Sequence, residues 1–472
     1  MTEYAAIDQE LSEIKGDDIE PQLSSGDAIE KVGFGWFQTR MVLLFGPAFI
    51  TDGAELVLVV FITLPITCLW GLSAVQKASL STVVYVGMSL GSIFCGVCSD
   101  RYGRRPIFLV STACVALFGL LSAISPNFYF FLICRTIIGF WIGGTHVPMA
   151  TMVEYFPIRM RHYAIILGQS VWLTSGINLV CLLAWLVVPN AGWRLLLALT
   201  IIPSLVPVVL FRMVPESVRW LMTMGRQSQA QAQIQDMARL NRKPPPGPLL
   251  PVPETDRGDL RQFYSKSLFK SMVLLTIINF TNTFVYNGIN LVSLVVLADN
   301  SNQISVRPRD DSGCPQMIAS DYLGFLVSGS AEWLVLLINS VLLRYVGRKK
   351  VLASHFATCC VGFCFLLLCV MSSASRSLIV LVLFVMRGSI VGSLQVTYQY
   401  IPELLPTSVR SSGYGILQAF ARFGGIVTPF VAQVLGGWDI TFALPVYIVL
   451  LVICVVCALV LPKETSQRQI ED

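Results

Sequence analysis

Long runs of apolar residues, broken by glycine, proline or short clusters of charge, fill most of the sequence. A helix needs about 20 apolar residues to cross the hydrocarbon core of a membrane. Each run is long enough for one crossing. The pattern therefore predicts twelve transmembrane helices, at residues 40–65, 77–98, 106–125, 127–151, 162–188, 193–214, 268–297, 321–346, 349–372, 376–401, 410–436 and 438–461.

Composition also indicates a multi-pass membrane protein. Of 472 residues, 54% are apolar and 13% are charged, whereas an average soluble domain has about 25% charged residues. A soluble chain of this size cannot bury so much apolar surface, so we expect a lipid bilayer around it. The net charge of +5 is spread over the connections between the runs. These observations exclude a soluble enzyme, a secreted disulfide-rich scaffold and a nucleic-acid-binding protein.

Lysine and arginine gather in every second connection, and this asymmetry predicts the orientation in the membrane. The even-numbered connections carry most of them, both in the long connection at 215–267 and at Arg101, Arg104, Arg105, Arg159, Arg161, Arg344, Arg348, Lys349, Lys350 and Arg410. We therefore expect both termini in the cytoplasm. The sequence leaves open whether the protein lies in the plasma membrane or in an intracellular vesicle membrane.

The two halves of the chain repeat each other. Gly103-Arg104-Arg105 recurs as Gly347-Arg348-Lys349 at an offset of 244, and Glu154 with Arg161 recurs as Glu403 with Arg410 at an offset of 249. Such landmarks indicate a duplicated six-helix unit. The predicted organisation is a cytoplasmic acidic tail at 1–38, a six-helix bundle at 39–214, a cytoplasmic linker at 215–267, a second bundle at 268–461 and a cytoplasmic tail at 462–472.

These landmarks resemble the major facilitator superfamily. The stretch from Gly96 to Arg105 matches its G-x-x-x-D-R-x-G-R-R signature, and Pro215-Glu216-Ser217 is similar to the sugar and organic-ion branch. Asp52-Gly53-Ala54-Glu55 looks like the synaptic vesicle 2-related, organic cation transporter-like proteins. The resemblance implies an all-α fold of two pseudo-symmetric six-helix bundles and transport by alternating access. One departure is Arg344, where the family usually keeps an acid.

Six charged residues fall in the middle of predicted helices, where an ionisable group is costly and is a functional candidate by default. They are three acids and three arginines: Asp52, Glu55, Glu332, Arg135, Arg387 and Arg422. The charges mark the first, fourth, eighth, tenth and eleventh helices as walls of a central cavity. Two alternatives stay open. The first is whether Arg135 and Arg387 line a solute site or pair with acids only to hold helices together. The second is whether Arg422 is neutralised by Glu332 or by an anionic solute.

Neutral polar and aromatic residues at helical spacing extend the predicted cavity. The candidates are Gln169, Trp172, Asn282, Tyr286, Gln395 and Tyr398. Such a lining suits a small amphipathic or ionic solute. The amides are equally well explained as hydrogen-bond links between helices.

Charges at the cytoplasmic ends form a second set. We expect ion pairs among them to close an inner gate when the protein faces outward. The residues are Asp100, Arg104, Glu154, Arg161, Glu216, Glu403 and Arg410. Cys68 and Cys314 fall in outer connections, where an oxidising compartment permits a disulfide, but spacing alone does not fix the pairing.

Together these features predict a secondary active transporter of a small organic ion, driven by a proton or ion gradient or by exchange. The alternative is a non-transporting sensor or binding protein on the same scaffold. We expect no enzymatic activity, cofactor or metal, because no nucleophile–base pair or metal-binding cluster stands out. The expected working unit is a monomer whose partners are the solute, the bilayer and, in the coupled case, a proton.

Overall fold

The computed structural model describes residues 23–145, 147–161, 171–250, 266–299, 317–372, 374–405, 410–462 and 464. Within these ranges the chain is helical, and 11 segments are long and apolar enough to cross a membrane. The first half contains α3 (Trp36–Trp70), α4 (Ala74–Tyr102), α5 (Arg104–Ala123), α6 (Phe128–Thr145), α7 (Val147–Tyr155), α9 (Trp172–Thr200) and α10 (Ile202–Val209). The second half contains α13 (Lys266–Asp299), α14 (Ala319–Tyr345), α15 (Arg348–Met371), α16 (Arg376–Leu404), α17 (Arg410–Pro429), η6 (Phe430–Leu435), α18 (Gly436–Trp438) and α19 (Ile440–Val460).

One of the 11 segments holds two predicted helices. The segment Trp172–Val209 is 38 residues long, which as one straight helix would measure about 57 Å, almost twice the hydrocarbon thickness. Gly192 lies inside it with φ 78° and ψ 173°, a backbone conformation that glycine adopts readily and that reverses the chain. The fifth and sixth predicted helices therefore meet at Gly192, and the described segments account for twelve crossings.

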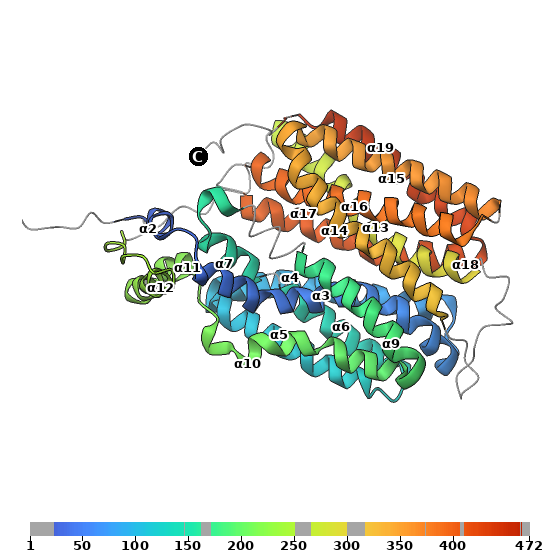
Figure 1. Cartoon of the computed structure of the whole chain (residues 1–472), viewed down its shortest axis with the longest axis horizontal. Helices are drawn as coiled ribbons and strands as arrows, with labels where there is room; N and C mark the ends of the chain where they lie inside the picture. Colours follow the sequence, from blue (N-terminus) through green and yellow to red (C-terminus); the bar gives the residue numbers. More distant parts are fainter. Residues whose placement is uncertain are drawn as a thin grey trace, which may run out of the picture.

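The helices pack as two bundles that repeat each other, with the first half below and the second half above in Figure 1. In the first half α4 packs against α6 and α3 against α9; in the second half α14 packs against α16 and α13 against α17. These are the same partners shifted by six predicted crossings. The arrangement matches the duplication that the sequence landmarks indicate.

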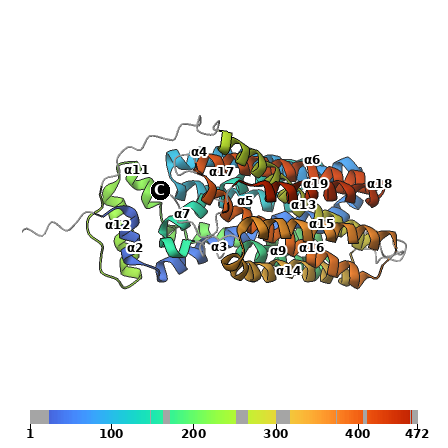
Figure 2. The same ribbon diagram turned by 90° about the horizontal axis from the view of Figure 1, so that it is seen from above.

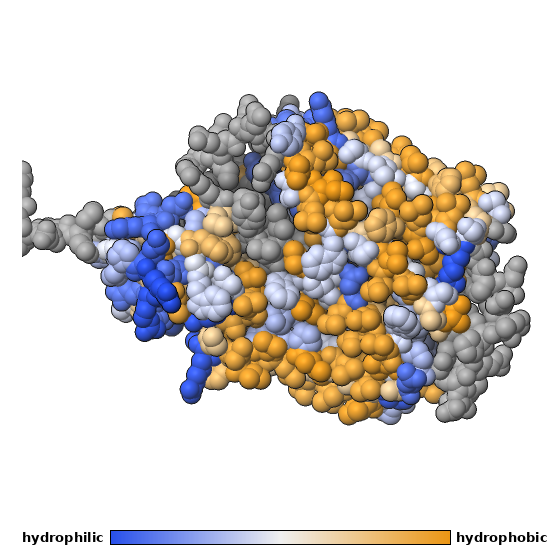
Figure 3. Space-filling view, viewed as in Figure 1, coloured by the Kyte–Doolittle hydropathy of each residue, from blue (hydrophilic) through white to orange (hydrophobic). Residues whose placement is uncertain are grey.

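Hydrophobic residues cover the body formed by the long helices, and hydrophilic residues gather at one end (Figure 3). That end holds three short helices, α2 (Ser25–Val32), α11 (Val218–Thr223) and α12 (Gln227–Leu240). They lie together beside the bundles in the second view as well (Figure 2). The face shown in Figure 3 is therefore largely apolar over the crossings and polar at one end.

The polar end is built from residues that the sequence assigned to the N-terminal tail and to the linker. The Leu23 amide donates to the carbonyl of Pro248 at 2.9 Å. The Asn241 side chain accepts from the Phe37 amide at 2.9 Å and donates to the carbonyl of Gly33 at 3.1 Å. The end of the tail and the first part of the linker thus pack on each other and hold the start of α3.

Candidate functional site

A buried ion pair lies inside the first half. Arg135 on α6 meets Glu55 on α3, with 2.5 Å between Nη2 and Oε2 and with 0% and 2% of the side chains exposed. Removing two charges from solvent is costly, and their mutual attraction offsets that cost only when they stay paired. The Nε and Nη1 atoms of Arg135 have no hydrogen-bond partner among the described residues. The two charges therefore cancel, but these two nitrogen atoms of Arg135 have hydrogens that no described acceptor receives.

A second buried ion pair lies in the second half. Arg387 on α16 donates from Nε to Oε1 of Glu332 on α14 at 2.7 Å, and 1% of each side chain is exposed. The other carboxylate oxygen, Oε2, accepts from the Thr174 hydroxyl at 3.1 Å. Thr174 belongs to α9 of the first half, so this pair is part of the contact between the halves. Glu332 therefore neutralises Arg387 rather than Arg422.

The remaining two mid-helix charges come together between the halves. Asp52 on α3 and Arg422 on α17 both act electrostatically on Tyr85 of α4 and on Tyr398 of α16. Asp52 is 3% exposed, Arg422 is half-buried, and neither charge is without a partner. Nη1 of Arg422 also contacts Sδ of Met88 at 3.2 Å. We call this group of Asp52, Tyr85, Tyr398 and Arg422 the central site.

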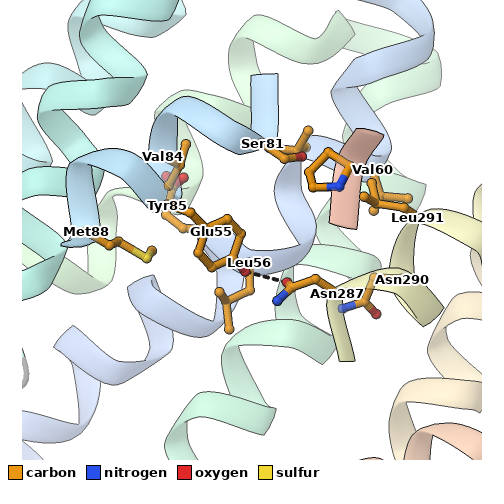
Figure 4. A pocket seen from close by; sticks show the side chains of 12 residues that line it. Glu55, Leu56, Val60, Ser81, Val84, Tyr85, Met88, Asn287, Asn290 and Leu291 are labelled. Carbon is orange, nitrogen blue, oxygen red and sulfur yellow. Dashed lines mark hydrogen bonds between the residues drawn. The ribbon is translucent and has the colours of Figure 1, made fainter. Parts of the chain in front are cut away.

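Next to the central site is a small pocket between α3, α4, α13 and α17. In Figure 4 the Tyr85 hydroxyl points to the Asn287 carbonyl oxygen, to which it donates a hydrogen bond across the two halves. Glu55 and Asn290 also line the pocket, and neither amide atom of Asn290 has a partner among the described residues. The cavity volume is about 20 Å³, which suits about one or two waters and is too small for an organic solute.

The predicted neutral residues have different surroundings. Asn282 is bonded at both ends of its amide within the second half, accepting from Ser393 at 2.5 Å and donating to Thr397 at 3.1 Å. The Trp172 ring fills the space beside Gly46, where a Cβ would come within 2.4 Å of it. Tyr286 lies close enough to Glu332 and Arg387 for their charges to act on it. Gln169 lies outside the described residues.

The first-half charges at the polar end form one cluster. Arg104 pairs with Glu154 at 2.5 Å, and the Ser217 hydroxyl donates to the other oxygen of Glu154. The Glu216 carboxylate accepts from the backbone amide of Arg104 at 3.0 Å. Burial, with the charges of Glu154 and Glu216, raises the pKa of the Tyr155 phenol above its usual range, so Tyr155 keeps the proton that it donates to the Glu216 carbonyl.

The second half repeats this cluster. Arg348 pairs with Glu403 at 2.6 Å, and its backbone amide donates to Glu464 at 2.7 Å. Among the described residues, no ion pair joins the two clusters, so each holds together the end of its own bundle. The described side chains at this end therefore form two separate clusters, one in each half.

Three other predicted gate positions contribute less to the clusters. Nε of Arg161 donates to the carbonyl of Phe156 at 3.4 Å. The backbone carbonyl of Asp100 accepts from the Trp220 indole at 2.9 Å, and Asp100 is exposed. Arg410 begins α17, and its side chain is not among the described ones. Cys68 is disulfide-bonded; Cys314 lies outside the described residues, so their pairing stays a prediction.

Comparison with known proteins identifies the family. The family described as "Sugar (and other) transporter" matches residues 51–472. The chain belongs to this family, within the major facilitator superfamily. It is 33% identical to the synaptic vesicle 2-related protein of Xenopus laevis over 94% of the chain and 82% of the relative. It is 30% identical to organic cation/carnitine transporter 7 of Arabidopsis thaliana over 94% of the chain and 95% of the relative.

Solved structures agree with this family. The chain is similar to a partially occluded inward-open conformation of the xylose transporter XylE from E. coli, with a TM-score of 0.71 and 18% identity over 92% of the chain and 99% of the other. The likeness confirms the predicted twelve-helix fold of two six-helix bundles. The protein is thus a multi-pass membrane transporter of the major facilitator kind.

Several residues around the site carried no signal in the sequence. Tyr85, Met88 and Thr174 are neutral, and nothing in their own helices distinguishes them from packing residues. Asn287 lies one position from the Tyr286 stripe that helical spacing indicated. Only the packing of α4 and α9 against the second half brings these side chains to the charges.

Proposed function

We propose that the protein is a secondary active transporter of a small organic ion, with the solute bound at the central site. One observation carries the proposal: Asp52 of the first half and Arg422 of the second half lie close enough to Tyr85 and Tyr398 for both charges to act on them. Asp52 and Arg422 come from opposite halves, whereas each of the other four mid-helix charges forms an ion pair within one half. A solute that carries a carboxylate, a cationic group or both finds a complementary partner there.

Alternating access is supported by where the halves touch. Phe61 of α3 packs on Tyr322 and Phe325 of α14, with ring centroids 5.8 and 5.3 Å apart. Thr82 of α4 donates to the carbonyl of Ile426 at 3.2 Å. These contacts lie on the side away from α2, α11 and α12, whereas no ion pair between described side chains joins the two charged clusters at the polar end. Rocking the halves, proposed at 39–214 and 268–461, would break the first set and bring the second set together.

The proposal also includes coupling of solute transport to a proton, through Asp52 and Glu55. Asp52 and Glu55 lie three residues apart on one face of α3, and Glu55 lines the pocket that adjoins the central site. A carboxylate in such a place can exchange a proton as the solute enters and leaves. Amides at both positions should abolish accumulation against a pH gradient and leave exchange partly intact. Unchanged accumulation in Asp52→Asn/Glu55→Gln would contradict coupling through these acids.

Orientation and location follow the charge pattern. We place the polar end, and with it both termini, in the cytoplasm, because the Arg104 and Arg348 clusters lie there. The synaptic vesicle 2-related relative favours an intracellular vesicle membrane over the plasma membrane. We expect one chain to be the working unit.

The direct test is uptake into proteoliposomes of three probes, with and without a pH gradient. Tetraethylammonium is cationic, benzoate is anionic, and carnitine carries both charges; the name of the Arabidopsis relative makes the first and third natural choices. Accumulation of at least one probe is expected. Saturable binding without accumulation of any probe would instead support the sensor alternative.

A further inference from the structure

A neutral hydrogen-bonded chain crosses three helices of the second half, outside the central site. Nε2 of His355 on α15 lies 2.9 Å from Oδ1 of Asn339 on α14. Nδ2 of Asn339 lies 3.1 Å from Oε1 of Gln395 on α16, and 3.1 Å from the carbonyl oxygen of Gly392. A Cβ at Gly392 would come within 2.5 Å of the His355 ring, so the close approach of the ring depends on glycine there.

The carbonyl of Gly392 fixes the direction of every bond in this chain. A backbone carbonyl oxygen can only accept, so the Asn339 atom facing it must be the NH₂ group. The Asn339 carbonyl oxygen then faces His355, and Nε2 of His355 must carry a hydrogen. The second hydrogen of the Asn339 NH₂ group points to Gln395, which meets it with its carbonyl oxygen.

Gln395 is thereby left with donors alone. Its carbonyl oxygen is occupied, whereas its Nε2 is buried and has no partner among the described residues. Only 4% of Gln395 is exposed. A buried donor without an acceptor is costly, so a bound solute that supplies an acceptor would be favoured there.

The position of Gln395 indicates which acceptor. It lies three residues before Tyr398 on α16, and residues three apart are neighbours on a helix surface. Tyr398 belongs to the central site. Gln395 is therefore a neighbour, one helical turn away, of a residue of the central site.

We propose that His355 and Asn339 hold Gln395 as a hydrogen-bond donor toward the solute, so that the transporter selects solutes with an acceptor oxygen, such as a carboxylate. This rests on the proposed transport function and specifies its selectivity. Gln395 is the specificity-determining residue. Asn339 and His355 are positioning residues that act through it.

The sharpest test reverses the direction of the hydrogen bond between residue 339 and Gln395. In Asn339→Asp the carboxylate has no hydrogen to give, so the Gln395 amide must turn, donate to it and present its carbonyl oxygen to the solute. The ratio of benzoate to tetraethylammonium uptake in proteoliposomes should fall by on the order of tenfold, the worth of one hydrogen bond to a charged group. Gln395→Leu should lower benzoate uptake by a similar factor, without the reversal that favours tetraethylammonium.

The matched control is Asn279→Asp. Asn279 is also a buried amide of the second half, but among the described residues its NH₂ group donates to the carbonyl of Leu275 in its own helix alone, at 2.8 Å. This variant adds the same charge and should leave the uptake ratio within about twofold. An equal fall in both Asp variants would overturn the proposal, because added charge alone would then explain it.

A second measurement tests the chain without transport. In ¹⁵N-histidine-labelled protein, the signal assigned by its loss in His355→Gln should show the hydrogen on Nε2. A hydrogen on Nδ1 alone would overturn the assigned direction. An unchanged uptake ratio in Asn339→Asp overturns the role of Gln395 while the transport function stands. Wild-type protein that takes up none of benzoate, tetraethylammonium and carnitine overturns both.

Discussion

The two buried ion pairs differ in how they meet the rest of the molecule. Their arginines correspond, because Arg387 follows Arg135 by 252 residues, close to the offset of the other repeated landmarks. Their acids do not correspond: Glu55 lies on the first crossing and Glu332 on the eighth. The Glu55–Arg135 pair stays within one bundle, whereas Thr174 of the opposite bundle touches the Glu332–Arg387 pair.

The comparison shows that the two halves share the position of the arginine but not the position of the acid that neutralises it. In the first half the pair stabilises a single bundle. In the second half the ion pair is also linked to the contact between the bundles, because the Thr174 hydrogen bond to Glu332 forms only when α9 packs against α14. Variants should therefore separate stability from conformational balance.

The largest expected effect comes from breaking either pair. Glu55→Leu leaves Arg135 charged and buried, which should lower the free energy of unfolding by about 3–5 kcal/mol. Glu332→Leu should cost a similar amount by leaving Arg387 alone. Thermal unfolding in detergent measures both. The double changes Glu55→Leu/Arg135→Met and Glu332→Leu/Arg387→Met should recover most of the loss, and a further decrease in either would show that the pairs are not the cause.

The next effect concerns the central site. Arg422→Lys replaces a planar fork with a point charge, so benzoate binding should weaken on the order of tenfold or more, while tetraethylammonium is little affected. Asp52→Asn should do the reverse. Binding of both labelled probes to both variants measures this crossed pattern. Equal losses for both probes would mean that the two charges only position each other.

A smaller effect is expected where the second ion pair touches the first half. Thr174→Val removes one hydrogen bond, worth about 1 kcal/mol, so the balance between conformations should shift about fivefold. Spin labels at the exposed positions Met224 and Tyr345, in a background without reactive cysteines, report the separation of the halves. Thr112→Val is the control, since its hydroxyl bonds only within α5. An identical distance distribution in the control and in Thr174→Val would show that the Thr174 hydrogen bond does not affect the conformational balance.

The smallest effect is expected at the polar end. Glu216→Gln and Glu464→Gln weaken clusters that are partly exposed, so each should cost less than about 1 kcal/mol. Raising the salt concentration should shrink the loss further. Unfolding scans at low and high salt check this. A loss as large as that of Glu55→Leu would show that these clusters are not screened by solvent.

Hydropathy and charge predicted the twelve crossings and the residues that cannot face lipid, because both are properties of one helix at a time. They did not predict which acid meets which arginine, since Glu55 and Arg135 lie 80 positions apart and three acids were available. Hydropathy and charge also did not predict the short helices α2, α11 and α12, because these lie in segments that were assigned to the N-terminal tail and to the linker.

Neutral positions were the hardest to predict. Asn282 and Gln395 looked alike in the sequence, as amides at cavity spacing. Only the packing of α13 and α14 against α16 shows that both ends of Asn282 are bonded and that one end of Gln395 is not. Tyr85 and Thr174 become important through contacts with the other half, which no local pattern encodes.

The most direct test of the central claim is solute accumulation in proteoliposomes by the wild-type protein beside Asp52→Asn and Arg422→Lys. With a pH gradient imposed, the wild-type protein should accumulate at least one of tetraethylammonium, benzoate and carnitine. Asp52→Asn should lose the cationic probe and Arg422→Lys the anionic one, with unfolding temperatures near wild type. Accumulation that neither variant alters would place the solute elsewhere and contradict a site formed by these two charges.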